Sequence, residues 1–393
     1  MTHGSSGDGV RRPYHYPLDL IRFAAATSVM AFHLAFYTWA SAPGSSTTNA
    51  FRHATSYSVT TPWTWFGWVG VEVFFVISGF VIANSAVGAT SGSFLKSRVL
   101  RLLPAAWICA SITLLVREFG GLERLDALVG PYVASLALWP AGPWIDGVYW
   151  SLAVEVTFYA LVFGLLRFRA FSLLPQVAWL LVLASGLFIG LSISGLDRSL
   201  PGWWMIRGVS EPLLLRHGAF FALGVWIWMS SERRLRPSDA LGVAAAAAIG
   251  CAEIWMRGQA LQDREALAAA GQPLILPILL WLSAVTVLAF VTRAPERFTP
   301  RSAVVRRGLR WMGLATYPLY LTHNDVGATM MRLLVQAGAP KWAALAVAVM
   351  TVVSIAFAVA LVFEPRVRQI LRRLIELAAA RGRTGAGAVA SAP

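Results

Sequence analysis

The sequence is poor in charged residues and in cysteine, and each scarcity excludes a class of protein. Charged residues make up 13% of the 393 positions, which is about half of their usual share in soluble domains. The two cysteines, Cys109 and Cys251, are too few for a disulfide framework, and no CxxC pair indicates a zinc or redox site. The segments between the apolar runs are too short for a soluble domain. A disulfide scaffold and a soluble globular fold are therefore both excluded.

Long apolar segments take the place of such a domain. Hydrophobic residues make up 57% of the chain, and runs of about 17–25 apolar residues, the length of a membrane-crossing helix, recur from one end to the other. We predict an all-α polytopic membrane protein with about ten transmembrane helices. Their ranges are 19–40, 66–86, 100–117, 147–166, 174–194, 208–229, 240–256, 273–292, 311–336 and 342–363. The stretch 127–141 is apolar but short, which predicts an interfacial or re-entrant piece.

The basic residues predict the orientation of these helices. The net charge is +14, and most Lys and Arg residues lie in segments that follow every second predicted helix. Because basic segments stay in the cytoplasm, both termini are expected there. The predicted division is a cytoplasmic tail over 1–18, a membrane domain over 19–364, and a basic, partly disordered cytoplasmic tail over 365–393. No basic surface domain remains that could bind nucleic acid.

Ionisable residues within the predicted helices mark candidate sites. A charge at mid-membrane costs about 2.5–3.5 kcal/mol on the insertion scale, so such residues are retained mainly for function. A helical rise of about 1.5 Å per residue puts four of them at a similar depth, about 18–20 Å from the cytoplasmic edge. These four are His33, Glu72, Glu155 and His323.

Arg22 and His33 lie eleven residues apart, about three helical turns, and therefore share one face of the first predicted helix. The pair can line one channel, with the arginine at its cytoplasmic mouth. Each residue also has a structural alternative. Arg22 can reach the membrane interface and pair with Asp19, and His33 can be a packing histidine.

Arg98 and Arg101 share a face at the cytoplasmic start of the third predicted helix, because they are three residues apart. Two guanidinium groups on one face suit a phosphate group, which they bind with forked donors. The alternative is simple anchoring of the helix on the positive side of the membrane.

Two polar stripes are expected to face the interior of the bundle, since facing lipid would be costly. Ser151, Glu155 and Tyr159 are spaced by four residues and form the first stripe. Thr316, Tyr320 and His323 form the second stripe. Pro318 lies within it and frees a backbone carbonyl, which is tolerated where a helix lines a cavity.

Six of these segments resemble, in order along the chain, the motifs of the acyltransferase-3 family of multipass membrane enzymes. They are Arg22 with His33, the FFxxSGF-like segment 74–80, Arg98 and Arg101 with Pro104, the WSLxxExxFY-like segment 150–159, Arg216 with Phe220 and Gly224, and the YPLYLxH-like segment 317–323. Thr316 stands where the family has serine and keeps the hydroxyl group. The resemblance covers nearly the whole membrane region.

The resemblance implies a membrane-bound O-acyltransferase in the bacterial plasma membrane. Such an enzyme moves an acyl group, with acetyl expected here, from cytoplasmic acyl-CoA to a hydroxyl group. The expected acceptors are a glycan, a lipid-linked sugar or a secondary metabolite. The implied partners are therefore acyl-CoA, the acceptor and membrane lipids.

The family motifs and the depth estimates together assign expected roles. A histidine titrates near neutral pH and can act as general base, so His33 is expected to deprotonate the acceptor or to carry the acyl group. Glu155 is expected to orient His33 or bind the acceptor, and His323 is a second acid–base candidate. Arg22, Arg98 and Arg101 are expected to bind acyl-CoA. The supporting residues are Glu72, Ser78, Trp150, Ser151, Tyr159, Arg216 and Tyr320.

The candidates for stabilising the oxyanion are Ser151, Tyr159 and Tyr320, and the sequence does not distinguish among them. A metal site is not expected, because the scattered His and Glu residues lack ligand spacing. The competing hypothesis is a transporter or flippase of a sugar- or lipid-linked substrate, in which the buried His, Glu and Arg residues form a proton relay. The Arg98–Arg101 pair favours the enzyme, because the phosphates of CoA give it a use that proton coupling does not.

Overall fold

The structure is a computed structural model that describes residues 14–389 except 43 and 45. Within those residues the chain is helical and contains no strand, so the predicted all-α class is confirmed. The first helix, α1 (Tyr16–Phe32), continues through one π-helical turn (His33–Tyr37) into α2 (Thr38–Ala40). The other long helices are α5 (Gly70–Ala86), α6 (Ser91–Phe119), α8 (Tyr149–Arg167), α9 (Leu174–Ser194), α11 (Gly218–Ser231), α12 (Pro237–Ala260), α13 (Ile275–Arg293), α14 (Ala303–Gln336), α15 (Lys341–Ala358) and α16 (Glu364–Val389).

Each of the ten predicted segments overlaps a helix, and eight helices of the described residues are long and apolar enough to cross a membrane. The chain is therefore a multipass membrane protein. The two remaining segments are 208–229 and 311–336. In the first, α11 is only 14 residues long, because the preceding stretch contains Pro212 and forms turns. In the second, α14 is long but polar, because it buries side chains such as Thr316, His323 and Asp325 inside the protein.

The shorter helices lie in the connections between the long ones. They are α3 (Ser46–Phe51), α4 (Thr61–Thr64), α7 (Leu125–Leu136) and α10 (Trp203–Val209). The predicted interfacial stretch overlaps α7, whose 12 residues are too few to cross a bilayer. Trp107 of α6 donates from its indole N–H to the Leu136 carbonyl at 2.9 Å, which holds α7 against α6.

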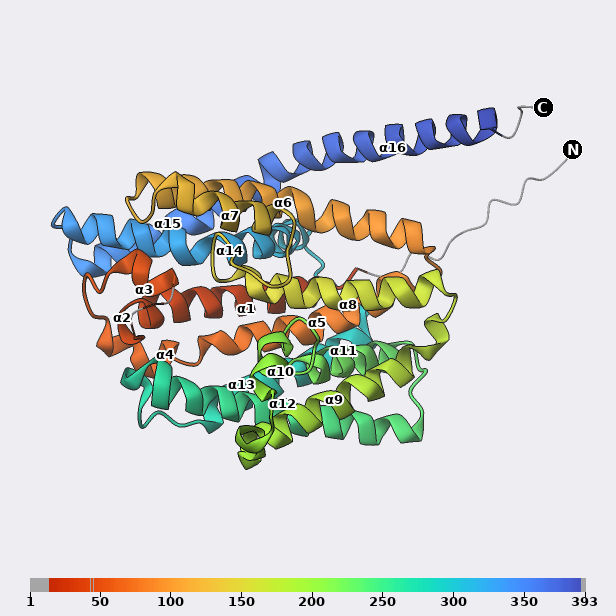
Figure 1. Cartoon of the computed structure of the whole chain (residues 1–393), viewed down its shortest axis with the longest axis horizontal. Coiled ribbons are helices and arrows are strands. Elements are labelled where there is room, and N and C mark those ends of the chain that lie inside the picture. Colours follow the sequence, from red (N-terminus) through yellow and green to blue (C-terminus); the bar gives the residue numbers. More distant parts are fainter. Residues whose placement is uncertain (1–13, 43, 45, 390–393) are drawn as a thin grey trace, which may run out of the picture.

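The long helices form one bundle in which α1, α5 and α14 occupy the middle (Figure 1). In that view α6, α7 and α15 lie on one side and α9, α12 and α13 on the other, while α16 extends beyond the bundle. The segment α14 packs against α1, α6 and α15, and α11 packs between α5 and α9. The basic tail predicted from residue 365 begins with α16. The first 13 residues, which make up most of the predicted N-terminal tail, lie outside the described residues.

Two glycines allow α5 and α11 to approach backbone to backbone. A Cβ atom on Gly224 would lie 2.0 Å from the Val76 carbonyl oxygen, and one on Gly79 would lie 2.2 Å from that of Phe221. Real side-chain atoms do not approach so closely, so only glycine fits both positions. The close crossing brings the beginning of α11 alongside the beginning of α5.

Candidate functional site

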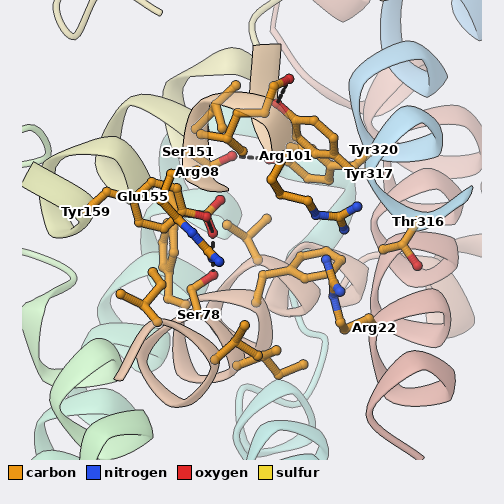
Figure 2. A pocket seen from close by; sticks show the side chains of 18 residues that line it. Arg22, Ser78, Arg98, Arg101, Ser151, Glu155, Tyr159, Thr316, Tyr317 and Tyr320 are labelled. Atoms are coloured by element: carbon orange, nitrogen blue, oxygen red, sulfur yellow. Dashed lines mark hydrogen bonds between the residues drawn. The ribbon is translucent and has the colours of Figure 1, made fainter. Parts of the chain in front are cut away.

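Three arginines meet in one cavity of about 100 Å³, here named the arginine cavity. Arg22 comes from α1, whereas Arg98 and Arg101 come from the first turns of α6. Figure 2 shows their guanidinium groups pointing into this space. The other polar residues that line it are Ser78, Ser151, Glu155, Tyr159, Thr316, Tyr317 and Tyr320.

The arginine cavity carries an excess of positive charge. Its three arginines face one carboxylate, Glu155. In the described part of the chain none of the three forms a salt bridge. The guanidinium group of Arg98 instead lies over the Tyr159 ring, 5.6 Å from its centroid. Converging guanidinium groups repel one another, so an anion with several acceptor oxygens would be bound favourably here.

The alternative partner of Arg22 is engaged elsewhere. Asp19 is buried and accepts a hydrogen bond from the Tyr14 hydroxyl group. Arg22 has no salt bridge to Asp19 among the described residues and lines the arginine cavity instead. The geometry therefore favours the interpretation in which Arg22 contributes to a binding site.

Glu155 is fixed on the wall of the arginine cavity by two short hydrogen bonds. Its Oε1 atom accepts from Ser78 Oγ of α5 and from the Tyr159 hydroxyl group, each at 2.7 Å. The polar stripe of α8 thus faces the bundle, as its spacing predicts. Glu155 does not line the same cavity as His33, so the structure does not bring these two predicted residues together.

His33 lines a second cavity of about 350 Å³, here named the histidine cavity. Val71 and Tyr320 line both cavities, so the two spaces adjoin at these residues. The hydroxyl groups of Tyr320 and Ser151 lie 2.6 Å apart at this boundary. The polar residues that line the histidine cavity are His33, Tyr37, Thr47, Glu72, Trp68, Trp150, Glu211, Arg216, His217, Glu253, Arg257, Tyr320 and Asn324.

The hydrogen bonds of His323 assign the proton positions of both site histidines. Its Nδ1 atom lies 2.8 Å from the Tyr320 carbonyl oxygen. A carbonyl only accepts, so Nδ1 carries the hydrogen and Nε2 of the neutral ring keeps a lone pair. That Nε2 atom lies 2.9 Å from His33 Nδ1, which must therefore donate. The Nε2 atom of His33 is then the nitrogen with a free lone pair.

Local helix geometry places His33 for this contact. It begins the π-helical turn His33–Tyr37 near the C-terminal end of the first membrane helix. Such wide turns rotate the following residues relative to a regular helix and are frequent at functional sites. His33 Nδ1 also lies 3.1 Å from the Val29 carbonyl oxygen, which agrees with its assignment as a donor.

A buried polar network that the sequence did not reveal holds α14 behind His323. Asn324 Nδ2 donates to Asp146 Oδ1 at 2.8 Å, and the backbone N–H of Asp325 donates to Asp146 Oδ2 at 3.1 Å. Arg117 of α6 forms a salt bridge with Asp325 at 3.3 Å. The charges of Arg117 and Asp325 inside predicted membrane helices were the available signal, because charges at membrane depth are rarely retained without a role.

A second missed group lines the histidine cavity. Glu253 of α12 accepts from Arg216 Nε at 2.7 Å, and Glu72 and His217 lie beside it. The sequence singled out Glu72 and Arg216 but not Glu253 or Arg257. A lone glutamate within the predicted helix 240–256 was again the available signal.

The predicted site residues thus divide between two adjoining cavities. The arginine cavity contains Arg22, Ser78, Arg98, Arg101, Ser151, Glu155 and Tyr159, and the histidine cavity contains His33, Glu72, Trp150 and Arg216. Tyr320 borders both, and His323 lies behind His33. Glu155 and His33 were expected to share one centre, but in the structure they line two neighbouring cavities.

Comparison with known proteins identifies relatives. The acyltransferase-3 family model, an acyltransferase domain, matches residues 15–363. The exopolysaccharide production protein ExoZ of Rhizobium meliloti (strain 1021) is 31% identical over 138 residues, which cover 33% of this chain and 41% of ExoZ. The chain thus matches about two fifths of the length of that relative. No solved structure matches. Neither match favours the transporter or flippase alternative.

Proposed function

Because the chain belongs to the acyltransferase-3 family, we propose that it is a membrane-bound O-acyltransferase. Its donor is cytoplasmic acyl-CoA, with acetyl as the acyl group. Its acceptor is a hydroxyl group of a glycan, a lipid-linked sugar or a secondary metabolite. Within that set the printed name of ExoZ, an exopolysaccharide production protein, favours a glycan.

The arginine cavity binds the CoA part of the donor. Arg22, Arg98 and Arg101 provide forked donors for phosphate oxygens or for the amide oxygens of pantetheine. Their excess of positive charge over the single carboxylate of Glu155 supports this role. The thioester then extends past the boundary at Val71 and Tyr320 toward the histidine cavity.

The observation that carries the proposal is the contact between His33 Nδ1 and His323 Nε2 at 2.9 Å. It leaves the lone pair of His33 Nε2 to accept the proton of the acceptor hydroxyl group as its oxygen attacks the thioester carbon. The same contact stabilises the imidazolium that forms, as an orienting partner does for other catalytic histidines. The CoA thiolate leaves and takes up the proton. Acylation of His33 itself is the alternative route.

The oxyanion of the tetrahedral intermediate needs a donor near the boundary of the two cavities. Tyr320 and Ser151 are hydrogen-bonded to each other there at 2.6 Å. Tyr159 lines only the arginine cavity and donates its hydroxyl hydrogen to Glu155. The position of the pair supports Tyr320 or Ser151 over Tyr159 as the donor.

The proposed membrane arrangement has ten crossings, which include α11 and α14, and cytoplasmic termini. Residues 1–18 and 365–393 are then cytoplasmic tails, and residues 19–364 are the catalytic domain in the bacterial plasma membrane. The contact between Lys96 of α6 and Glu376 of α16, at 2.9 Å, supports this arrangement. It joins the C-terminal tail to the end of the bundle from which Arg98 and Arg101 line their cavity.

Acyl transfer by the purified protein tests the proposal. Full-length protein in liposomes is supplied with radiolabelled acetyl-CoA and with an extract of the native cells as source of acceptor. Thioester consumption and a labelled product identified by mass spectrometry are expected. Movement of a sugar-linked substrate across the liposome membrane with the thioester intact would contradict the proposal.

A further inference from the structure

Three ionisable side chains meet in the histidine cavity, apart from the His33–His323 pair. Glu72 lies in the first turn of α5, His217 precedes α11, and Glu253 lies on α12. Their exposed fractions are 4%, 2% and 1%. One oxygen of each carboxylate and one ring nitrogen of the histidine all lie within 4.8 Å of one another.

These groups have unused lone pairs. Among the described residues, neither ring nitrogen of His217 has a hydrogen-bond partner, and the same holds for Glu72 Oε2 and Glu253 Oε2. Buried polar atoms are almost always paired. A hydrogen bond between His217 and either carboxylate would satisfy both, yet none forms within this group, whose potential ligand atoms lie within 4.8 Å of one another. Three potential ligand atoms that converge without bonding to one another form an arrangement that a cation can hold together.

The surroundings hold each potential ligand in place. The His217 ring packs against Phe75 and Trp150, with ring centroids 5.0 and 5.3 Å away. Arg216 Nε donates to Glu253 Oε1 at 2.7 Å, which leaves Oε2 of the same carboxylate as the free ligand atom. Orientation of a ligand by such an outer partner is usual at metal sites.

The charge of the cavity is compatible with a divalent cation. Three carboxylates, Glu72, Glu211 and Glu253, line it together with two guanidinium groups, Arg216 and Arg257. With all three carboxylates ionised and the histidines neutral, this gives a formal charge of −1. One carboxylate thus remains uncompensated by arginine, and a metal ion would compensate it.

We infer that Glu72, His217 and Glu253 bind a divalent transition-metal ion, with Zn²⁺ as the best match. One imidazole and two carboxylates suit Zn²⁺, and three protein ligands leave a fourth position for water or a substrate oxygen. All three residues line the cavity that contains His33, so the metal lies beside the proposed reaction centre. This site goes beyond the proposed function, which requires no metal.

Metal content tests the inference without reference to activity. Full-length wild-type protein in detergent, stripped with EDTA and then incubated with Zn²⁺, is analysed by mass spectrometry for zinc. One Zn²⁺ per chain is expected. His217→Phe, which preserves the aromatic packing, and Glu253→Gln should each weaken Zn²⁺ binding at least 10-fold. Glu211→Gln is the matched control: it removes the same charge from the same cavity outside the three ligands, and it should keep the metal.

Three results would overturn the inference. Wild-type protein could bind no zinc above its stripped level, or both ligand variants could keep one Zn²⁺ per chain. Equal loss in Glu211→Gln and Glu253→Gln would indicate a general effect of charge. Should a variant fail to fold, the site is tested instead by substituting Co²⁺ into the wild-type protein. Visible d–d bands of four-coordinate Co²⁺ support the site, and the octahedral spectrum of free Co²⁺ contradicts it.

Discussion

His323 Nε2 accepts a hydrogen bond from His33 Nδ1 at 2.9 Å, and this contact leaves His33 Nε2 as the nitrogen that can accept a proton. The acceptor of the contact is fixed from behind, because His323 Nδ1 donates to the Tyr320 carbonyl oxygen at 2.8 Å. Two residues 290 positions apart in the chain therefore act as one unit. The predictions below separate this unit from the donor site and from the membrane topology.

Replacing His33 should abolish most of the acyl transfer. His33→Ala removes the proposed base and should lower the rate about 10²–10⁴-fold, the usual contribution of a general base. His33→Gln should fail similarly, because an amide does not accept a proton near neutral pH. Thioester consumption in liposomes is the measurement. The exposed His53 provides a control, and His53→Gln should be fully active. A His33→Ala variant with wild-type rates would remove His33 from the reaction centre.

Replacing His323 should have a smaller effect that appears in kcat rather than in acyl-CoA binding. His323→Ala removes the acceptor for His33 Nδ1, and loss of a hydrogen bond to a charged group costs about 1.5–3 kcal/mol. The expected decrease in kcat is about 10- to 150-fold. His323→Gln should recover part of it, because its side-chain oxygen can accept the same hydrogen. If kcat is unchanged and only KM rises, His323 does not act through His33.

The arginine cavity is tested by acyl-CoA binding. Arg98→Ala and Arg101→Ala should each weaken binding by about 1.5–3 kcal/mol, the value of a charge-assisted contact. Lysine should rescue poorly, because it lacks the planar fork of arginine. Calorimetry on the purified protein is the measurement. Arg124, whose side chain is 91% exposed, provides the control Arg124→Ala. A variant that carries both alanine replacements and still binds CoA normally would show that Arg98 and Arg101 serve only to anchor the helix in the membrane.

Reporter fusions test the ten-crossing arrangement. A fusion after Arg366 should behave as cytoplasmic, and one near Gly195, which ends α9, as extracytoplasmic. Fusions between α11 and α12, near Arg234, should again be cytoplasmic if the short α11 crosses the membrane. A cytoplasmic signal at both Gly195 and Arg366 together with an extracytoplasmic one near Arg234 would contradict the arrangement.

Much of the fold could be read from local pattern. Runs of apolar residues of bilayer length located the long helices of the bundle but not α16, because crossing a membrane imposes a length and a composition that this basic helix does not have. The exceptions have local causes. Pro212 delays the start of α11, and α14 is polar because it carries the site. The shared face of Arg98 and Arg101 also follows from helical spacing alone, and in the structure both line one cavity.

Only the tertiary structure decided which helices bring their polar residues together. Glu155 and His33 lie at similar predicted depths, yet they face different cavities. Glu155 bonds to Ser78 of α5, whereas Glu72, six residues earlier on the same helix, lines the cavity of His33. The meeting of Glu72, His217 and Glu253 depends on the close crossing of α5 and α11. The amino-acid sequence therefore determined the membrane class, the helices and the ionisable residues that they carry. Contacts between helices depend on rotation, crossing and packing of several segments at once, which no single segment encodes.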